Sequence, residues 1–194
     1  MSVATKLRES VQVYTTNVIV SDTFNRVDGA LGTADTGQIW RIILGGVTVV
    51  SNQAKASSTA ECVVLLDSGA QRPTVTCDQV YGAAQSMAII SSSDAAGANY
   101  LMSRVDNTTA YIFVKSANVF INGSTSAAIP FTTPSTQTVS MSVAGSVVSL
   151  YVGAVRVVTR TLTTAELTAT TGTYCGVRSA GSLAGVWDNF SVSV

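Results

Sequence analysis

The segment from residue 137 to residue 161 reads QTVSMSVAGSVVSLYVGAVRVVTRT, and its pattern indicates the class of fold. Hydrophobic and hydroxyl side chains alternate at its start, so Val139 and Met141 lie on one face of an extended strand. The alternation is interrupted at residues 144–145 and 153–154, and each break contains a glycine, as hairpin turns commonly do. The segment therefore predicts three antiparallel strands side by side, with one face in a core.

The same pattern of short β-type runs bounded by turn residues recurs along the chain. A helical pattern is confined to one expected turn at 164–167, capped by Thr163 or Thr164, and no strand–helix–strand alternation exists. We predict an all-β antiparallel two-sheet β-sandwich of jelly-roll type. It would occupy residues 21–194, preceded by residues 1–20 as an N-terminal arm or first strand. Outside 137–143, 146–152 and 155–161, the expected strands are 38–44, 46–51, 61–67, 73–81, 86–91, 99–105, 110–116, 118–121, 172–178 and 186–194.

The composition is poor in charge. Only 11% of the 194 residues are charged, 46% are hydrophobic, and 11 basic residues balance 11 acidic ones. An evenly balanced chain without basic runs argues against nucleic acid as a partner, and no apolar run is long enough to span a membrane. The first residues lack the apolar core of a signal peptide, so we expect synthesis in a cytoplasm. This composition fits either a large core beneath a surface rich in serine and threonine, or a weakly charged surface that contacts copies of the same chain or other proteins, and we favour the second interpretation.

The residue inventory argues against catalysis. The chain has no histidine, which excludes Ser–His and Cys–His mechanisms and His-ligated zinc. Its three glutamates lie far apart, so no strand carries the paired carboxylates of a glycoside hydrolase. Three widely spaced cysteines lie in apolar runs, and we expect them to be buried thiols. We therefore predict a protein that is not an enzyme.

Two motifs lie near opposite ends of the chain. The first runs DTFNRVDGALGTADTGQIW from Asp22 to Trp40, and the second reads WDNF from Trp187 to Phe190. Together they resemble the concanavalin A-like lectin and glucanase superfamily, specifically the laminin-G-like jelly-roll domains of phage structural and minor tail proteins. The resemblance spans nearly the whole chain and implies the same jelly-roll fold.

These motif residues have a structural interpretation and a functional alternative. Glycines suit tight turns, and aromatic side chains at the joint of the chain ends supply apolar area. Arg26 could pair with Asp22, Asp28 or Asp188. The expected structural set is Phe24, Arg26, Gly29, Gly32, Trp40, Trp187 and Phe190. The alternative is a calcium site, as in some relatives of this superfamily, with Asp22, Asp28, Asp188 and Asn189 as ligands; no other cofactor is expected.

The resemblance implies a role in a phage virion. On this hypothesis the protein is a non-enzymatic capsid decoration or minor tail component, located in the virion, that packs on other virion proteins and on copies of itself as a homo-oligomer. The alternative is a carbohydrate-binding adhesion module that recognises host cell-surface glycans. Aromatic rings and amide groups would form its shallow sugar site; the candidate residues are Tyr100, Tyr111, Asn107 and Asn122.

Overall fold

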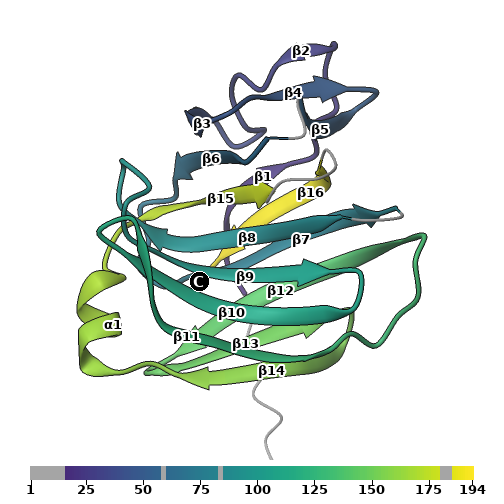
Figure 1. Ribbon diagram of the computed structural model, residues 1–194. Coiled ribbons are helices and arrows are strands. Elements are labelled where there is room, and N and C mark those ends of the chain that lie inside the picture. Colours follow the sequence, from purple (N-terminus) through teal and green to yellow (C-terminus); the bar gives the residue numbers. More distant parts are fainter. Residues whose placement is uncertain (1–15, 58–59, 83–84, 180–184) are drawn as a thin grey trace, which may run out of the picture.

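Two antiparallel sheets stack face to face in the computed structural model, which describes residues 16–57, 60–82, 85–179 and 185–194 (Figure 1). The nine-stranded sheet runs in the order β14 (Val155–Thr161), β13 (Val147–Val152), β12 (Ser135–Ala144), β7 (Thr74–Tyr81), β16 (Val186–Ser193), β5 (Gln53–Ala56), β4 (Val47–Val50) and β2 (Gly29–Ala30), with β1 (Val18–Asp22) paired to β16. The seven-stranded sheet runs in the order β11 (Val119–Ala128), β10 (Thr109–Ser116), β9 (Tyr100–Asp106), β8 (Ser86–Ser93), β15 (Tyr174–Ser179), β6 (Cys62–Asp67) and β3 (Arg41–Leu44). This architecture confirms the predicted jelly-roll sandwich.

The main hydrophobic core lies between the two sheets. Strand β7 shows how it forms, because every second residue from Val75 to Tyr81 is buried while its neighbours are partly exposed. The predicted hairpins are present: Ala144 pairs with Val147 across one turn, and Val152 pairs with Val155 across the next. The three cysteine thiols are free and buried.

The two ends of the described chain lie side by side. Strand β1 pairs antiparallel with β16, and Asn17 and Val194 exchange backbone hydrogen bonds of 2.9 and 3.0 Å. Within the predicted arm or first strand, residues 16–17 lead into β1 and residues 18–20 belong to it. Residues 1–15 lie outside the described residues. The sequence motifs at the two ends thus meet in one place.

The expected elements differ from the structure at β2 and β5, which were not predicted from the sequence, and at β11. The sequence predicts a strand over 118–121, whereas β11 extends from Val119 to Ala128 through a small, polar stretch that contains Gly123. A register shift between Phe113 and Val114 of β10 accommodates a bulge in β11, and pairing with β10 then continues to Ala128. Backbone pairing in the sheet therefore overrides the weak strand propensity of this stretch.

Helix α1 (Thr164–Ala169) follows β14 at the edge of the sandwich (Figure 1). Its cap is Thr163, which forms a capping box with Glu166. Glu166 is buried and pairs with Arg160, whose guanidinium also donates to the carbonyl of Ile112 in β10 at 3.1 Å. This buried pair connects the two sheets at the edge formed by β14.

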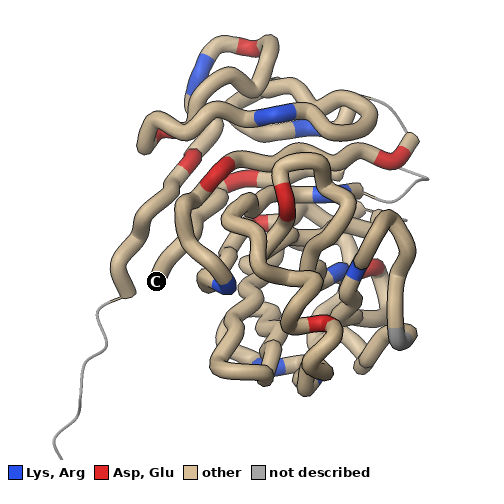
Figure 2. Tube along the Cα trace, turned by 90° about the vertical axis from the view of Figure 1, so that its left-hand side faces the viewer, with Lys and Arg blue, Asp and Glu red and all other residues tan. Residues whose placement is uncertain are grey.

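Charged residues are sparse along the described chain (Figure 2). Among the helices that the described residues form, none is long and apolar enough to cross a membrane.

Candidate functional site

The outer face of the seven-stranded sheet carries a second hydrophobic cluster, separate from the main core. In β6 the side chains of Val64 and Leu66 enter the main core, and Val63 and Leu65 lie on the opposite face. Because both faces of β6 are buried, its sequence reads as an uninterrupted apolar run. The buried members of this outer cluster are Val63, Leu65, Ala88, Ile90, Tyr100 and Met102, with Ile43, Phe113 and Tyr174 packed against them.

The loop between β8 and β9 folds back over part of this outer face. Its Gly97 is buried and has a positive φ of 66°, and a Cβ atom there would lie 3.0 Å from Ile43 and 3.7 Å from Leu65. Lys115 of β10 donates to the carbonyl of Gly97 at 3.1 Å. Glycine is required here because the loop backbone approaches the sheet closely in a conformation that other residues rarely adopt. Beyond this loop the outer face is partly exposed over β10 and β11, at Tyr111, Phe113 and Phe120.

An aromatic and cationic cluster occupies this open part of the face. The rings of Tyr111 and Phe113 are stacked, with centroids 5.5 Å apart, and the guanidinium of Arg104 lies 4.4 Å and 5.1 Å from their respective centroids. Phe120 of β11 continues the aromatic surface 5.4 Å from Phe113 and is 42% exposed. These contacts hold the Arg104 guanidinium by cation–π attraction.

The cluster continues toward β15 through buried polar groups. Arg178 donates from Nε to Glu61 at 2.7 Å and lies 5.7 Å from the Phe120 ring centroid. Tyr100 lies beneath, with the Lys115 ammonium 4.9 Å from its ring centroid. The Tyr100 side chain is fully buried, and its hydroxyl has no hydrogen-bond partner among the described residues. Burial raises the pKa of Tyr100 to about 12, so the hydroxyl keeps its proton at neutral pH.

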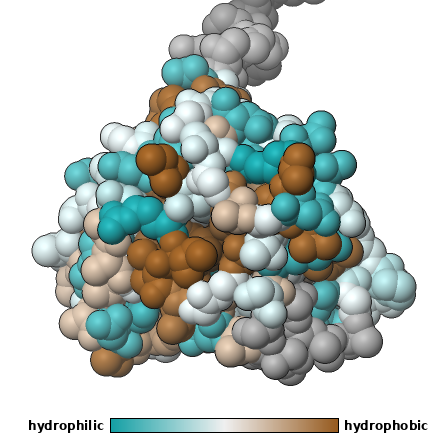
Figure 3. All heavy atoms as spheres, turned by 90° about the horizontal axis from the view of Figure 1, so that it is seen from above, coloured by the Kyte–Doolittle hydropathy of each residue, from teal (hydrophilic) through white to brown (hydrophobic). Residues whose placement is uncertain are grey.

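A separate pocket of about 310 Å³ lies at the other edge of the seven-stranded sheet, near β3. Arg41 donates to the hydroxyl of Tyr174 at 3.3 Å, and its guanidinium lies 5.7 Å from the ring centroid. The lining residues are Gln38, Ile39, Arg41, Asp67 and Tyr174. Figure 3 looks down on the end of the molecule with β2 to β5, where hydrophobic side chains are exposed among hydrophilic ones; the exposed hydrophobic residues of this region include Ile39, Ile42 and Leu44.

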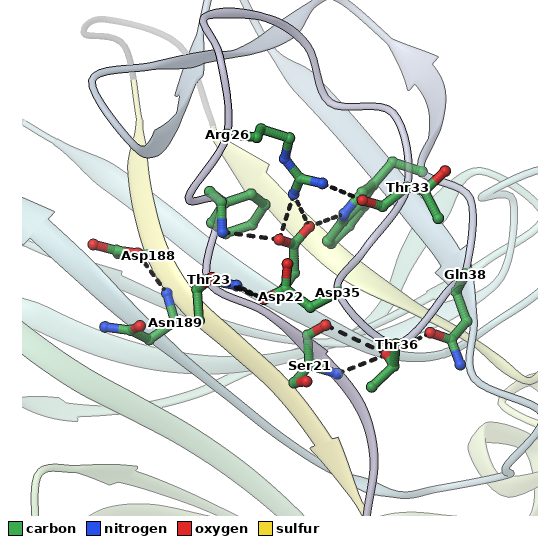
Figure 4. A network of polar contacts seen from close by, with 12 residues as sticks. Ser21, Asp22, Thr23, Arg26, Thr33, Asp35, Thr36, Gln38, Asp188 and Asn189 are labelled. Carbon is green, nitrogen blue, oxygen red and sulfur yellow. Dashed lines mark hydrogen bonds and ion pairs between the residues drawn. The ribbon is translucent and has the colours of Figure 1, made fainter.

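The long N-terminal motif builds a buried polar joint rather than an open site (Figure 4). Asp22 is fully buried, and its carboxylate accepts hydrogen bonds from the backbone of Phe24 at 2.8 Å and from the indole of Trp40 at 2.6 Å. Of the three possible partners of Arg26, it is Asp22 that forms the ion pair, with both carboxylate oxygens. The Trp40 ring lies 5.1 Å from that of Phe190, so the joint links the N-terminal motif to β16.

The structure does not bring the four candidate calcium ligands together. Both oxygens of Asp22 already accept from protein donors, and Asp28 accepts from the backbone of Ser51 at 2.8 Å on the molecular surface. Asp188 accepts from the backbone of Asn189, whose amide donates to Asp78 at 2.9 Å; Figure 4 shows this pair apart from the Asp22 carboxylate. Within the described residues no group of three or more His, Cys, Asp or Glu side chains could hold a metal ion. The chain therefore supplies no assembled calcium site from these residues.

The four candidate sugar-binding residues separate as well. Tyr111 lies half-buried in the aromatic cluster, and Tyr100 lies on the same face but beneath it. Asn107 is directed elsewhere: its amide accepts from the backbone of Gln85 at 2.8 Å and donates to the carbonyl of Gly82 at 2.7 Å, so both ends of the amide already have partners in the backbone beside β7 and β8. Asn122 belongs to β11, and its side chain lies outside the described residues.

Sequence reasoning missed three members of the cluster, namely Arg104, Phe113 and Phe120. Alternation in residues 110–116 does place Tyr111, Phe113 and Lys115 on one face of a strand, opposite Ile112 and Val114. A strand with both faces apolar or aromatic is the signal that could have identified this surface. The partner strands could not be read from the sequence, so neither could the position of Arg104 over the two rings.

Comparisons with known proteins support the fold. No protein-family model matches the chain, and no curated protein matches it. Among solved structures, a carbohydrate-binding module, CBM66 from Bacillus subtilis, has a TM-score of 0.64 and 13% identity, covering 80% of this chain and 95% of that one. The catalytic domain of an endo-1,3-β-glucanase from Thermotoga petrophila has a TM-score of 0.60 and 10% identity, covering 93% of this chain and 98% of that one. SCLam, an endo-β-1,3(4)-glucanase, has a TM-score of 0.62 and 11% identity, covering 92% and 91%.

The chain therefore has the concanavalin A-like jelly-roll fold that is found in carbohydrate-binding modules and in endoglucanases. At these identities the likeness concerns the fold.

Proposed function

We propose that the protein binds carbohydrate on the outer face of the seven-stranded sheet, through the cluster of Arg104, Tyr111, Phe113 and Phe120. The observation that carries the proposal is the aromatic surface itself, because Phe120 is 42% exposed and Tyr111 and Phe113 are half-buried beside it. Aromatic side chains exposed next to hydrogen-bonding groups match the apolar faces and polar edges of a sugar ring.

Polar side chains border the rings on the neighbouring strand. In β11, Ser124 pairs with Phe113 and Ser126 pairs with Tyr111, and both serines are exposed. Cross-strand partners have side chains on the same face of a sheet, so the two hydroxyls lie beside the rings. The guanidinium of Arg104 supplies donors on the other side. A sugar placed on the rings would therefore meet hydrogen-bonding groups at its edges.

The proposed activity is binding without hydrolysis. A glycoside hydrolase needs two carboxylates across the sugar, about 5–10 Å apart. The described carboxylates of the outer face already have protein partners: Glu61 pairs with Arg178, and Asp106 accepts from the backbone of the turn after β9. Asp67, at the far edge near β3, accepts from Thr173 at 2.6 Å. These observations support a binding protein, although some structures of similar fold are glucanases.

The role in a phage virion, predicted from the resemblance, stays a prediction. The structures of similar fold reported above bind or cleave carbohydrate, which favours the adhesion alternative. A glycan-binding face is compatible with a place on a virion, because adsorption to a host requires such a surface.

Affinity electrophoresis in gels that contain neutral and acidic polysaccharides tests the proposal. We expect retardation by at least one polysaccharide and a loss of at least about tenfold in affinity for Tyr111→Ala and for Phe120→Ala, as for other central aromatic contacts. Tyr151→Ala is the matched control, since Tyr151 lies half-buried in β13 of the other sheet. Absence of binding throughout, or an equal loss in the control, would refute this site.

A further inference from the structure

The proposed sugar-binding face gathers three cations, and two of them, Arg104 and Lys115, have no carboxylate of the described residues within hydrogen-bond distance. Of the nine lysines and arginines in the described residues, three have their charged groups on the outer face: Arg104 in β9, Lys115 in β10 and the buried Arg178 in β15. Near them, Glu61 is bonded to Arg178 at 2.7 Å. Asp106 lies 3.9 Å from Arg104, and the charges of Glu61 and Asp94 act on Lys115, so the cations and carboxylates of this face are equal in number, but Arg104 and Lys115 form no close ion pair with a described residue.

Arg104 is held in place without a full partner. Its nearest carboxylate is Asp106, whose oxygen is 3.9 Å from the guanidinium, beyond hydrogen-bond distance. Asp106 in turn accepts from the backbone of Thr108 and Thr109, at 3.0 and 2.8 Å. The Nε of Arg104 is buried and has no partner among the described residues. The two aromatic rings therefore fix a guanidinium whose hydrogen-bonding capacity is not used.

Lys115 presents a second incompletely compensated cation. Its ammonium donates to the carbonyl of Gly97, and none of the described carboxylates lies within 4 Å of it. Burial lowers the pKa of Lys115, the charge of Arg178 acts in the same direction, and the charges of Glu61 and Asp94 offset only part of this effect. Beside it, the buried hydroxyl of Tyr100 lacks a partner among the described residues. An anion at this position would be stabilised by the ammonium.

We infer that the carbohydrate bound at this face is an acidic polysaccharide, whose anionic groups pair with Arg104 and Lys115 while its rings lie on Tyr111 and Phe120. The inference rests on the proposed function and names the class of ligand. A guanidinium presents a planar fork of donors that fits the oxygens of a carboxylate or a sulfate, and the surrounding aromatic side chains strengthen such a charge-assisted bond. Carboxylates and sulfates share this chemistry, and the probes below distinguish them.

Isothermal titration of the full chain with matched pairs of polymers tests the inference. Polygalacturonate is compared with its highly methyl-esterified form, in which the carboxylates are neutralised, and dextran sulfate is compared with dextran. We expect at least one anionic polymer to bind at least about tenfold more tightly than its neutral match, with an affinity that falls as salt rises. Preference for polygalacturonate would identify carboxylate as the bound group, and preference for dextran sulfate would identify sulfate.

Variants locate the anion. We expect Arg104→Gln to weaken binding of the preferred polymer about tenfold or more, the effect of losing a charge-assisted hydrogen bond. Arg104→Lys should recover only part of that loss, since lysine keeps the charge but not the fork. Arg156→Gln is the matched control, because Arg156 is exposed in β14 of the other sheet. Thermal unfolding of each variant separates loss of binding from loss of folding.

The outcomes distinguish the two proposals. If neutral polymers bind as tightly as their anionic matches and Tyr111→Ala abolishes that binding, the result supports the sugar-binding face and refutes the preference for an acidic ligand. The acidic ligand is also wrong at this face if Arg156→Gln weakens binding as much as Arg104→Gln. If none of the polymers binds, including those of the broader electrophoresis panel, both proposals fail.

Discussion

The buried carboxylate of Asp22 provides the sharpest test of how the two ends of the chain are joined. The variant Asp22→Asn keeps the shape of the side chain and removes its charge. In asparagine an NH₂ group replaces one of the two carboxylate oxygens. That group would face either the backbone N–H of Phe24 or the indole N–H of Trp40, and it cannot accept a hydrogen bond from either donor. The variant thus loses a charge-assisted hydrogen bond in either orientation, and it loses the ion pair with Arg26.

The magnitude follows from the burial of the groups. Hydrogen bonds to charged groups contribute about 1.5–3 kcal/mol each, and breaking a buried pair costs about 3–5 kcal/mol. The Arg26 side chain is 24% exposed and can be hydrated in the variant, so the lower end applies. We expect the free energy of unfolding to fall by about 3 kcal/mol and the Tm to fall by about 6–12 °C in a domain of this size.

Equilibrium unfolding in urea, followed by tryptophan fluorescence and circular dichroism, measures this loss. Asp28→Asn is the control, because Asp28 is exposed and an asparagine oxygen can still accept from the Ser51 backbone. We expect the control to change stability by less than about 0.5 kcal/mol. A loss below about 1 kcal/mol for Asp22→Asn, or an equal loss for the control, would show that the carboxylate network is not what holds the joint.

Three other perturbations test the sandwich. Glu166→Gln breaks the buried pair with Arg160, so we expect urea unfolding to report a loss of about 2–4 kcal/mol; an unchanged midpoint would contradict the role of that pair. Gly176→Ala should abolish soluble expression or lower the Tm sharply, because its Cβ would lie 2.0 Å from the carbonyl oxygen of Val64. Burial raises the pKa of Cys175 from about 9 to about 11, so its thiol holds its proton more tightly in the folded state, and stability should fall as pH rises from 9 to 11. Cys175→Ala should flatten that part of a series of urea midpoints, and an equally steep decline in the variant would contradict the assignment.

The sequence alone predicts the fold class because the pattern that specifies it is local. Alternation with a period of two appears within single strands such as β7 and β12, and two-residue turns follow from glycine positions such as Gly145 and Gly153. The helix cap at Thr163 is likewise readable, since a capping box spans only four residues. Strand β11 was predicted too short because its extension depends on pairing with β10, which is not a local property.

The candidate site was predicted only in part. Tyr111 is predicted as a sugar-binding residue and lies in the cluster, whereas Asn107, predicted from its residue type alone, bonds to the backbone of Gly82 and Gln85 instead. Whether an aromatic or amide side chain is exposed depends on which strands flank it and on what covers it. The ammonium of Lys115 and the ring of Phe120 lie against Tyr100, and neither contact is visible in the sequence around it.

The sequence by itself therefore determined the all-β class, the hairpins and the positions of their turns, because these depend on residues close together along the chain. Only the tertiary structure decided that Asp22 is buried and accepts hydrogen bonds from Arg26 and Trp40. It alone also decided that the Arg104 guanidinium lies over the ring of Tyr111. Register between strands fixes which side chains share a face, and a shift of one residue reverses the face of every side chain in a strand. The charge and aromatic pattern of the outer face is thus a consequence of strand order and register.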